Sequence, residues 1–158
     1  MKLYVASSWR NHMHPLVVAK LREAGHEVYD FKNPSPGNHG FHWSEIDRLW
    51  ENWGPRQFAE SLLHPLAVEG EHRDFSAMEW ADAGVLLLPC GRSAHLEAGY
   101  FVGAKKPLYI HIPVCVEPEL MYRMAFRTGG AISCSTIDEM VASIPLDAAR
   151  KEVRSDQY

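Results

Sequence analysis

The chain has 158 residues, which is enough for one domain of ordinary size with a core of its own. Its formal net charge of −4 gives no electrostatic reason to expect nucleic-acid binding. It contains no apolar run of about 18 residues, so we expect no membrane span, and its short apolar start resembles a strand more than a signal peptide. Three unclustered cysteines indicate free thiols in a reducing compartment, so we expect a cytoplasmic protein.

The chain opens with a predicted strand, helix and second strand. Residues 3–6 form an apolar run, residues 13–24 place apolar side chains at helical spacing, and residues 26–31 again favour a strand. Gly25 stands where a glycine often ends a helix. Two parallel strands joined by a helix imply a right-handed crossover.

Residues 32–54 have no regular pattern but carry many aromatic side chains, among them Trp43. A stretch of this length without regular structure is uncommon inside a compact domain and is usually functional. One interpretation is a flap that covers a substrate and stacks aromatic rings on a nucleobase, with Trp43 in the pocket. The other is a satellite hydrophobic cluster beneath a long loop. The sequence leaves both open.

The rest of the chain again alternates between helices and strands. Helices are predicted at 56–63, 66–80, 119–124 and up to 143, and strands at 84–88, 108–112 and 131–133. This alternation predicts an α/β fold with a mostly parallel sheet. Five strands with polar turns after the first and third favour a flavodoxin-like three-layer sandwich of strand order 2-1-3-4-5. We expect a single domain over residues 1–144 and a charged tail over 145–158.

The stretch from residue 81 to residue 107 is the most informative one. An apolar run between Gly84 and Pro89 predicts a strand buried on both faces, and a polar turn follows it. Ser93 is then expected to cap a helix whose first turn also carries Glu97 on the same face. A carboxylate there lies near the carboxyl edge of the sheet, where open α/β folds bind ligands. The alternative is a glutamate that is favoured there only by the helix dipole.

Several motifs resemble the nucleoside 2-deoxyribosyltransferase family. They are YVASSWR near the amino terminus, Asp74 eight residues before Asp82 in WADAGVLLLP, and GRSAHLEAGYFVGAKKPLYI. The resemblance covers residues 2–110 with a poorly matching middle, and it implies the same flavodoxin-like fold. It also implies transfer of a 2-deoxyribosyl group between nucleobases through a covalent glycosyl intermediate on Glu97.

The resemblance assigns further roles. Glu97 matches the nucleophile, which must be ionised, and a helix amino terminus with nearby hydroxyl groups favours that state. Asp74 matches the aspartate that manages the proton of the departing base; alternatively it is a solvated residue paired with Arg73 or His72. Asp82 is better explained by a turn or capping role at the far end of the sheet. No cofactor is implied, because the transferred group comes from the substrate.

This sequence also departs from the family. Many members have an aspartate six residues before the nucleophile that grips the sugar hydroxyl, and Gly91 stands at that place here. Related nucleotide N-glycosidases bind a 5′-phosphate with serines and backbone amides of the same turns, as helix amino termini favour. The candidate residues of such a site are Ser7, Ser8, Arg10, Gly91, Arg92 and Ser93. Arg92 is equally well explained as a surface charge.

The resemblance also suggests roles for Tyr4 and for residues after the fourth strand. Tyr4 matches a tyrosine that lies near the nucleophile in relatives, although a strand tyrosine is as often a core residue. In relatives, residues after the fourth strand reach the neighbouring subunit's active site, so we expect a homo-oligomer with Met121 and Tyr122 in a shared wall. Histidine spacings give no metal site, and Cys90 is expected to be a small lining residue.

The sequence therefore predicts an enzyme whose partners are a nucleoside or nucleotide and a free nucleobase. Two alternatives stay open. The chain could hydrolyse a nucleoside or a nucleoside 5′-monophosphate on the same scaffold. It could also be a non-catalytic module that binds a nucleotide, because one scaffold hosts many functions.

Overall fold

The structure is a computed structural model that describes residues 1–146, so most of the predicted tail lies outside the described residues. Its centre is a five-stranded sheet in which every neighbouring pair is parallel. The strand order β2-β1-β3-β4-β5 confirms the predicted 2-1-3-4-5 arrangement. The strands are β1 (Lys2–Ala6), β2 (Glu27–Tyr29), β3 (Ala83–Leu87), β4 (Leu108–His111) and β5 (Ile132–Ser133).

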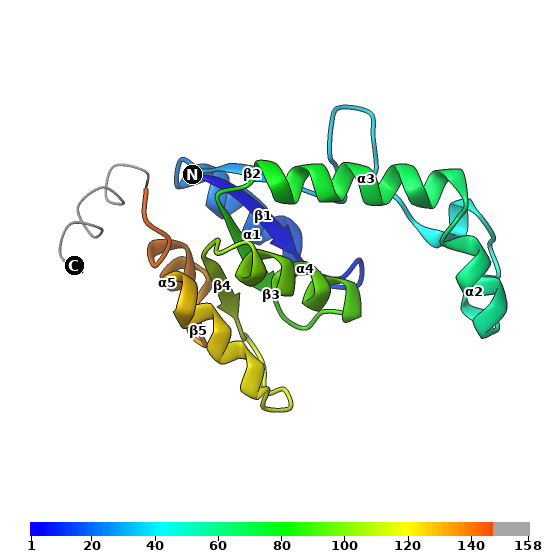
Figure 1. Cartoon of the computed structure of the whole chain (residues 1–158). Helices are drawn as coiled ribbons and strands as arrows, with labels where there is room; N and C mark the ends of the chain where they lie inside the picture. Colours follow the sequence, from blue (N-terminus) through cyan, green and yellow to red (C-terminus); the bar gives the residue numbers. More distant parts are fainter. Residues whose placement is uncertain (147–158) are drawn as a thin grey trace.

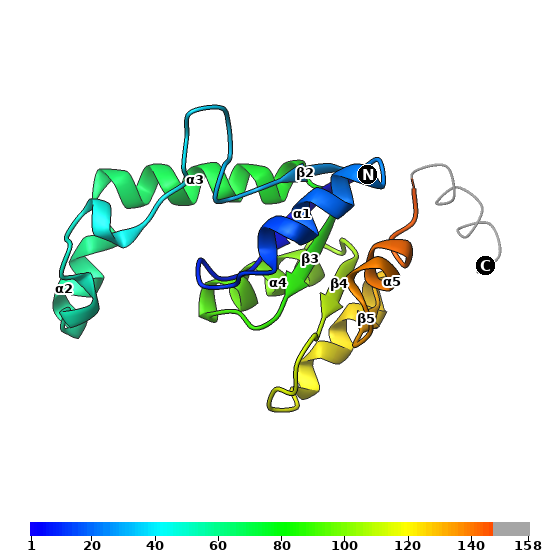
Figure 2. The ribbon, with the colours of Figure 1, turned by 180° about the vertical axis from the view of Figure 1, so that it is seen from behind.

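Helices cover both faces of the sheet and make three layers (Figures 1 and 2). Helices α1 (His14–Glu23) and α5 (Ile137–Ala142) lie on one face. Helices α3 (Pro65–Trp80) and α4 (Arg92–Gly103) and the 3₁₀ segment η3 (Leu120–Thr128) lie on the other. The remaining elements are η1 (Trp43–Glu45), η2 (Trp50–Asn52) and α2 (Pro55–Ser61). None of the helices in the described range is long and apolar enough to cross a bilayer.

The two faces of the sheet carry separate cores. Because strand side chains alternate, Leu3 and Val5 of β1 face α1 and α5, whereas Tyr4 and Ala6 face α3 and α4. Gly84 lets α4 approach closely: a Cβ there would lie 2.6 Å from the Phe101 ring, too close for any real contact. This close approach brings the face of α4 that carries Glu97 over β1 and β3.

Two predicted boundaries were wrong for local reasons. The second strand ends at Tyr29 rather than at residue 31, because Asp30 turns the chain by accepting hydrogen bonds from the Lys32 amide and the Asn33 side chain. Ser93 does not cap α4. The helix begins at Arg92, and its N-cap is Gly91 in extended conformation.

Helix α2 and the first half of α3 project beyond the sheet, and we call residues 41–68 the arm (Figures 1 and 2). Its aromatic rings pack edge to face on one another, with Trp43 contacting Phe41, Trp53 and Phe58 at centroid distances of 4.9, 5.7 and 5.8 Å. Phe41 also packs against Gly70 of α3, where a Cβ would lie 2.8 Å from it. These contacts support the cluster interpretation of this stretch.

Candidate active site

Glu97 lies on the side of α4 that faces β1, close to the hydroxyl of Tyr4. It is half-buried, and Tyr4 is 1% exposed. Burial and the nearby negative charge of Asp74 raise the pKa of Glu97 to about 7. A hydrogen bond from Tyr4 stabilises the carboxylate and opposes that rise in pKa, but it does not cancel it.

The prediction that Glu97 lies in the first turn of its helix, where the amino terminus favours its ionised state, was wrong. Because α4 begins at Arg92, Glu97 is its sixth residue and lies past the first turn, where the helix dipole acts. Its environment is instead dominated by burial against the sheet and by a second carboxyl group. Because its pKa is about 7, Glu97 is partly protonated at neutral pH.

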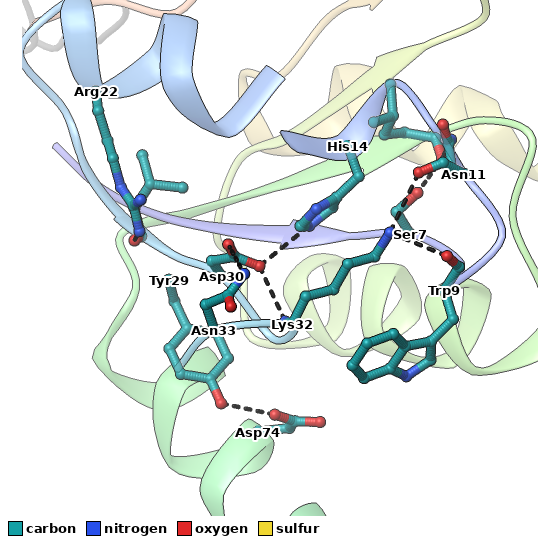
Figure 3. A network of polar contacts seen from close by, with 12 residues as sticks. Ser7, Trp9, Asn11, His14, Arg22, Tyr29, Asp30, Lys32, Asn33 and Asp74 are labelled. Atoms are coloured by element: carbon teal, nitrogen blue, oxygen red, sulfur yellow. Dashed lines mark hydrogen bonds and ion pairs between the residues drawn. The ribbon is translucent and has the colours of Figure 1, made fainter. Parts of the chain in front are cut away.

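The second carboxyl group, Asp74, comes from α3 and accepts a 2.7 Å hydrogen bond from the hydroxyl of Tyr29 at the end of β2 (Figure 3). Burial raises the pKa of Asp74, although the Tyr29 bond and the Arg73 charge pull it down. The Tyr29 ring stacks on the Tyr4 ring with centroids 5.5 Å apart. Glu97, Tyr4, Tyr29 and Asp74 thus form a continuous group.

Sequence reasoning missed Tyr29. The available signal was its place at the carboxyl end of the second strand, which is the edge where ligands bind in this topology. A tyrosine in a strand is commonly a core residue, so the position alone carries little weight. In the structure its ring packs on Tyr4 while its hydroxyl reaches the carboxylate of α3, which gives one side chain both roles.

Two turns at the carboxyl edge of the sheet carry the other polar candidates. In the turn after β1, the Ser7 hydroxyl donates to the Leu87 carbonyl at 3.0 Å, and the Ser8 hydroxyl accepts from the Arg10 amide at 3.2 Å. Arg10 is largely exposed and pairs with Glu51 of the arm at 3.3 Å. The structure thus places Ser7 and Ser8 within the turn framework, whereas Arg10 faces outward.

The turn after β3 leads into α4. Arg92 and Ser93 are exposed. The N-cap residue Gly91 has no side chain, so the first backbone amides of the helix receive no hydrogen bond from a capping side chain. Because these amides are a ready site for an anion, Gly91, Arg92 and Ser93 keep their place as candidate binding residues.

A third group connects the start of α4 with η3. His95 Nε2 is 2.9 Å from the Tyr122 hydroxyl, and the two rings stack with centroids 5.9 Å apart. Burial and the charge of Glu97 raise the pKa of Cys90 to about 11, so its thiol is protonated at neutral pH and is no ready nucleophile. Met121 projects from η3 and is 59% exposed.

The aromatic candidates divide between two places. Trp43 belongs to the arm and contacts other arm rings. Trp9 lies in the turn after β1 itself, is 39% exposed, and contacts Phe31 and His42 edge to face. Sequence reasoning missed Trp9, although it directly follows Ser8.

Two further predictions concerned Asp82 and metal binding. Asp82 accepts a 2.8 Å hydrogen bond from the Lys2 amide at the start of β1, which is a structural role at the far end of the sheet. Within residues 1–146, no three His, Cys, Asp or Glu side chains stand together as metal ligands would.

Together these features define a flavodoxin-like α/β protein with two interacting carboxyl groups on the face of its sheet that α3 and α4 cover. No protein-family model matches the chain, and no curated protein matches it. Among solved structures, it is similar to the 2-deoxyribosyltransferase of the psychrotolerant bacterium Bacillus psychrosaccharolyticus, with a TM-score of 0.54 and 18% sequence identity. The match covers 94% of this chain and 95% of the other, so the two share their fold over nearly their whole length.

Proposed function

We propose that this protein transfers a 2-deoxyribosyl group between nucleobases through a covalent intermediate on Glu97. The observation that carries the proposal is the Glu97 and Asp74 pair, joined through Tyr4 and Tyr29 on the face of the sheet that α3 and α4 cover. A deoxyribosyltransferase with this fold supports it. A nucleophile and a proton-transfer group in one site are what exchange at an N-glycosidic bond requires.

In the first step, the ionised Glu97 carboxylate attacks C1′ of the sugar. The C1′–N bond breaks, its electron pair stays with the departing base, and Asp74 supplies the proton that the base takes up. In the second step, an acceptor base loses its proton to Asp74 and attacks C1′, which releases the Glu97 carboxylate. This step needs an ionised Glu97 beside a protonated Asp74, and burial raises the pKa of Asp74 and so favours its protonated form.

Tyr4 and Tyr29 orient the two carboxyl groups. The Tyr4 hydroxyl donates to Glu97, and its buried ring cannot move away from β1. The hydroxyl of Tyr29 holds Asp74 from the adjacent strand. Because the tyrosine pKa values are raised far above neutral by burial and by these carboxylates, both hydroxyls remain protonated donors.

Hydrolysis of a nucleoside or nucleoside 5′-monophosphate is the second candidate. It is favoured by the exposed Arg92 and Ser93 beside the uncapped start of α4, which would suit a phosphate. A non-catalytic nucleotide-binding module would need the same turns but not an ionisable residue at position 97. We also propose a homo-oligomer in which the exposed Met121 contacts a second copy.

Chromatography of products separates these candidates. The purified protein is incubated with a panel of deoxynucleosides, with and without a different free base, beside Glu97→Ala. A new deoxynucleoside that forms only with acceptor base and intact Glu97 supports transfer. Free base without acceptor indicates hydrolysis, and the panel is then repeated with ribonucleosides and 5′-monophosphates. If no substrate is consumed but a nucleotide still binds Glu97→Ala, the binding module is favoured.

A further inference from the structure

The side chain of Asn11 joins the two turns of the candidate site. Asn11 follows the turn after β1 and is only 4% exposed. Its amide nitrogen donates to the carbonyl of Leu87 at 3.3 Å and to that of Pro89 at 3.1 Å, and both acceptors belong to the end of β3 and the turn beyond it. Its amide oxygen accepts from the Met13 amide at 2.9 Å. The whole side-chain amide is therefore engaged in fixing one turn against the other.

Lys32 binds the backbone of the same turn (Figure 3). Its ammonium group donates to the carbonyl of Trp9 at 3.0 Å and to that of Asn11 at 3.2 Å. The same ammonium lies 5.9 Å from the ring centroids of Trp9 and Phe31. Lys32 thus fixes the backbone of the turn that contains Ser7, Ser8 and Arg10.

We propose that Asn11 is a positioning residue that sets the spacing between the turn of residues 7–10 and the turn of residues 88–91, with Lys32 as a second clamp on the first turn. The proposal rests on the proposed function, because the second turn leads into α4, which carries Glu97, and both turns hold candidate binding residues. Only an amide can donate to two carbonyl groups here and accept from an amide at the same time. An aspartate of nearly identical shape would instead place oxygen against both carbonyls.

The first test compares Asn11→Asp with Asn52→Asp, a matched change at an exposed position of the arm. We expect Asn11→Asp to raise KM about tenfold to a hundredfold, as two lost buried hydrogen bonds imply, with a much smaller change in kcat. Asn52→Asp is expected to keep both values. A variant that merely loses folded protein would show a lower apparent kcat at unchanged KM, and that result would overturn the proposal.

The second test needs no activity. Hydrogen exchange of wild type, Asn11→Asp and Lys32→Met is followed by mass spectrometry. We expect faster exchange in residues 7–13 and 88–94, with unchanged protection in β4 and α5. Unchanged exchange in those two turns, or faster exchange throughout, would overturn the proposal. Lys32→Met gives a second route if Asn11→Asp fails to fold. If wild type turns over no substrate, the proposed function fails, and the exchange pattern still decides whether Asn11 positions the turns.

Discussion

The rings of Tyr4 and Tyr29 stack on the face of the sheet that α3 and α4 cover, with centroids 5.5 Å apart and planes inclined by 14°. Each ring belongs to a different strand, and each hydroxyl is directed to a different carboxyl group, Glu97 or Asp74. The stacked pair therefore fixes where two residues from two separate helices meet. The electrostatics of this group should control how activity and stability depend on pH.

The activity of wild type should depend on pH through Glu97. Its pKa is raised to about 7, and the nucleophile must be ionised, so we expect kcat/KM to fall about tenfold per pH unit below that value. Asp74→Asn removes a negative charge that raises this pKa, so the acid limb of the residual activity should move to lower pH. The pH profile of kcat/KM is measured from about pH 5 to about pH 9. An acid limb unmoved in Asp74→Asn would contradict the coupling.

Tyr4→Phe should move the same limb in the opposite direction. The hydrogen bond from Tyr4 stabilises the Glu97 carboxylate, so its loss raises the pKa of Glu97 further and shifts the acid limb to higher pH. The substitution keeps the buried ring and its stacking on Tyr29. Tyr100→Phe on α4 serves as the matched control, and its profile should overlay that of wild type. A downward shift in Tyr4→Phe would refute the assigned contact.

The stability of Glu97→Gln should exceed that of wild type at alkaline pH. The folded-state pKa of Glu97 is raised from an ordinary 4.5 to about 7, so the stability of wild type is complete below about pH 4.5 and declines as the pH rises through 7. Glutamine does not ionise and avoids this decline. Urea unfolding at pH 8 should show an advantage of roughly 2–3 kcal/mol, which vanishes near pH 4.5. An equal advantage at both pH values would contradict the assigned burial of the charge.

Two tryptophan variants should have different effects. Trp9→Ala removes from the turn beside Ser8 a partly exposed ring that contacts Phe31 and His42, so we expect a higher KM and a smaller loss of stability than in Trp43→Ala. Trp43→Ala removes the ring that contacts Phe41, Trp53 and Phe58, so we expect a loss of about 3 kcal/mol in unfolding free energy. Kinetics and urea unfolding are measured on both. If Trp43→Ala raises KM without loss of stability, the flap interpretation is restored.

The fold could be predicted because breakers bound the short apolar runs and helices alternate with strands. The run before Pro89 predicted a buried strand, and five strands with polar turns after the first and third, together with the family resemblance, indicated the strand order that the structure has. Glu97 and Asp74 were found through short motifs, and their roles remain predictions. Tyr29 and Asn11 were missed because their partners, Asp74 and Leu87, are 45 and 76 positions away in the chain. The pKa of Glu97 was misjudged because it depends on burial, which only the packed structure reveals.

The covalent intermediate provides the most direct measurement. The protein is mixed with a deoxynucleoside at about pH 7, the raised pKa of Glu97, where part of the protein carries an ionised Glu97. The mixture is quenched rapidly in acid and digested with trypsin. Cleavage after Arg92 and Lys105 yields a peptide of residues 93–105 in which Glu97 is the only acidic side chain. We predict that this peptide gains the mass of one deoxyribosyl group as free base is released, and that Glu97→Gln shows neither event. Base release by Glu97→Gln at the wild-type rate would contradict the proposed role of Glu97.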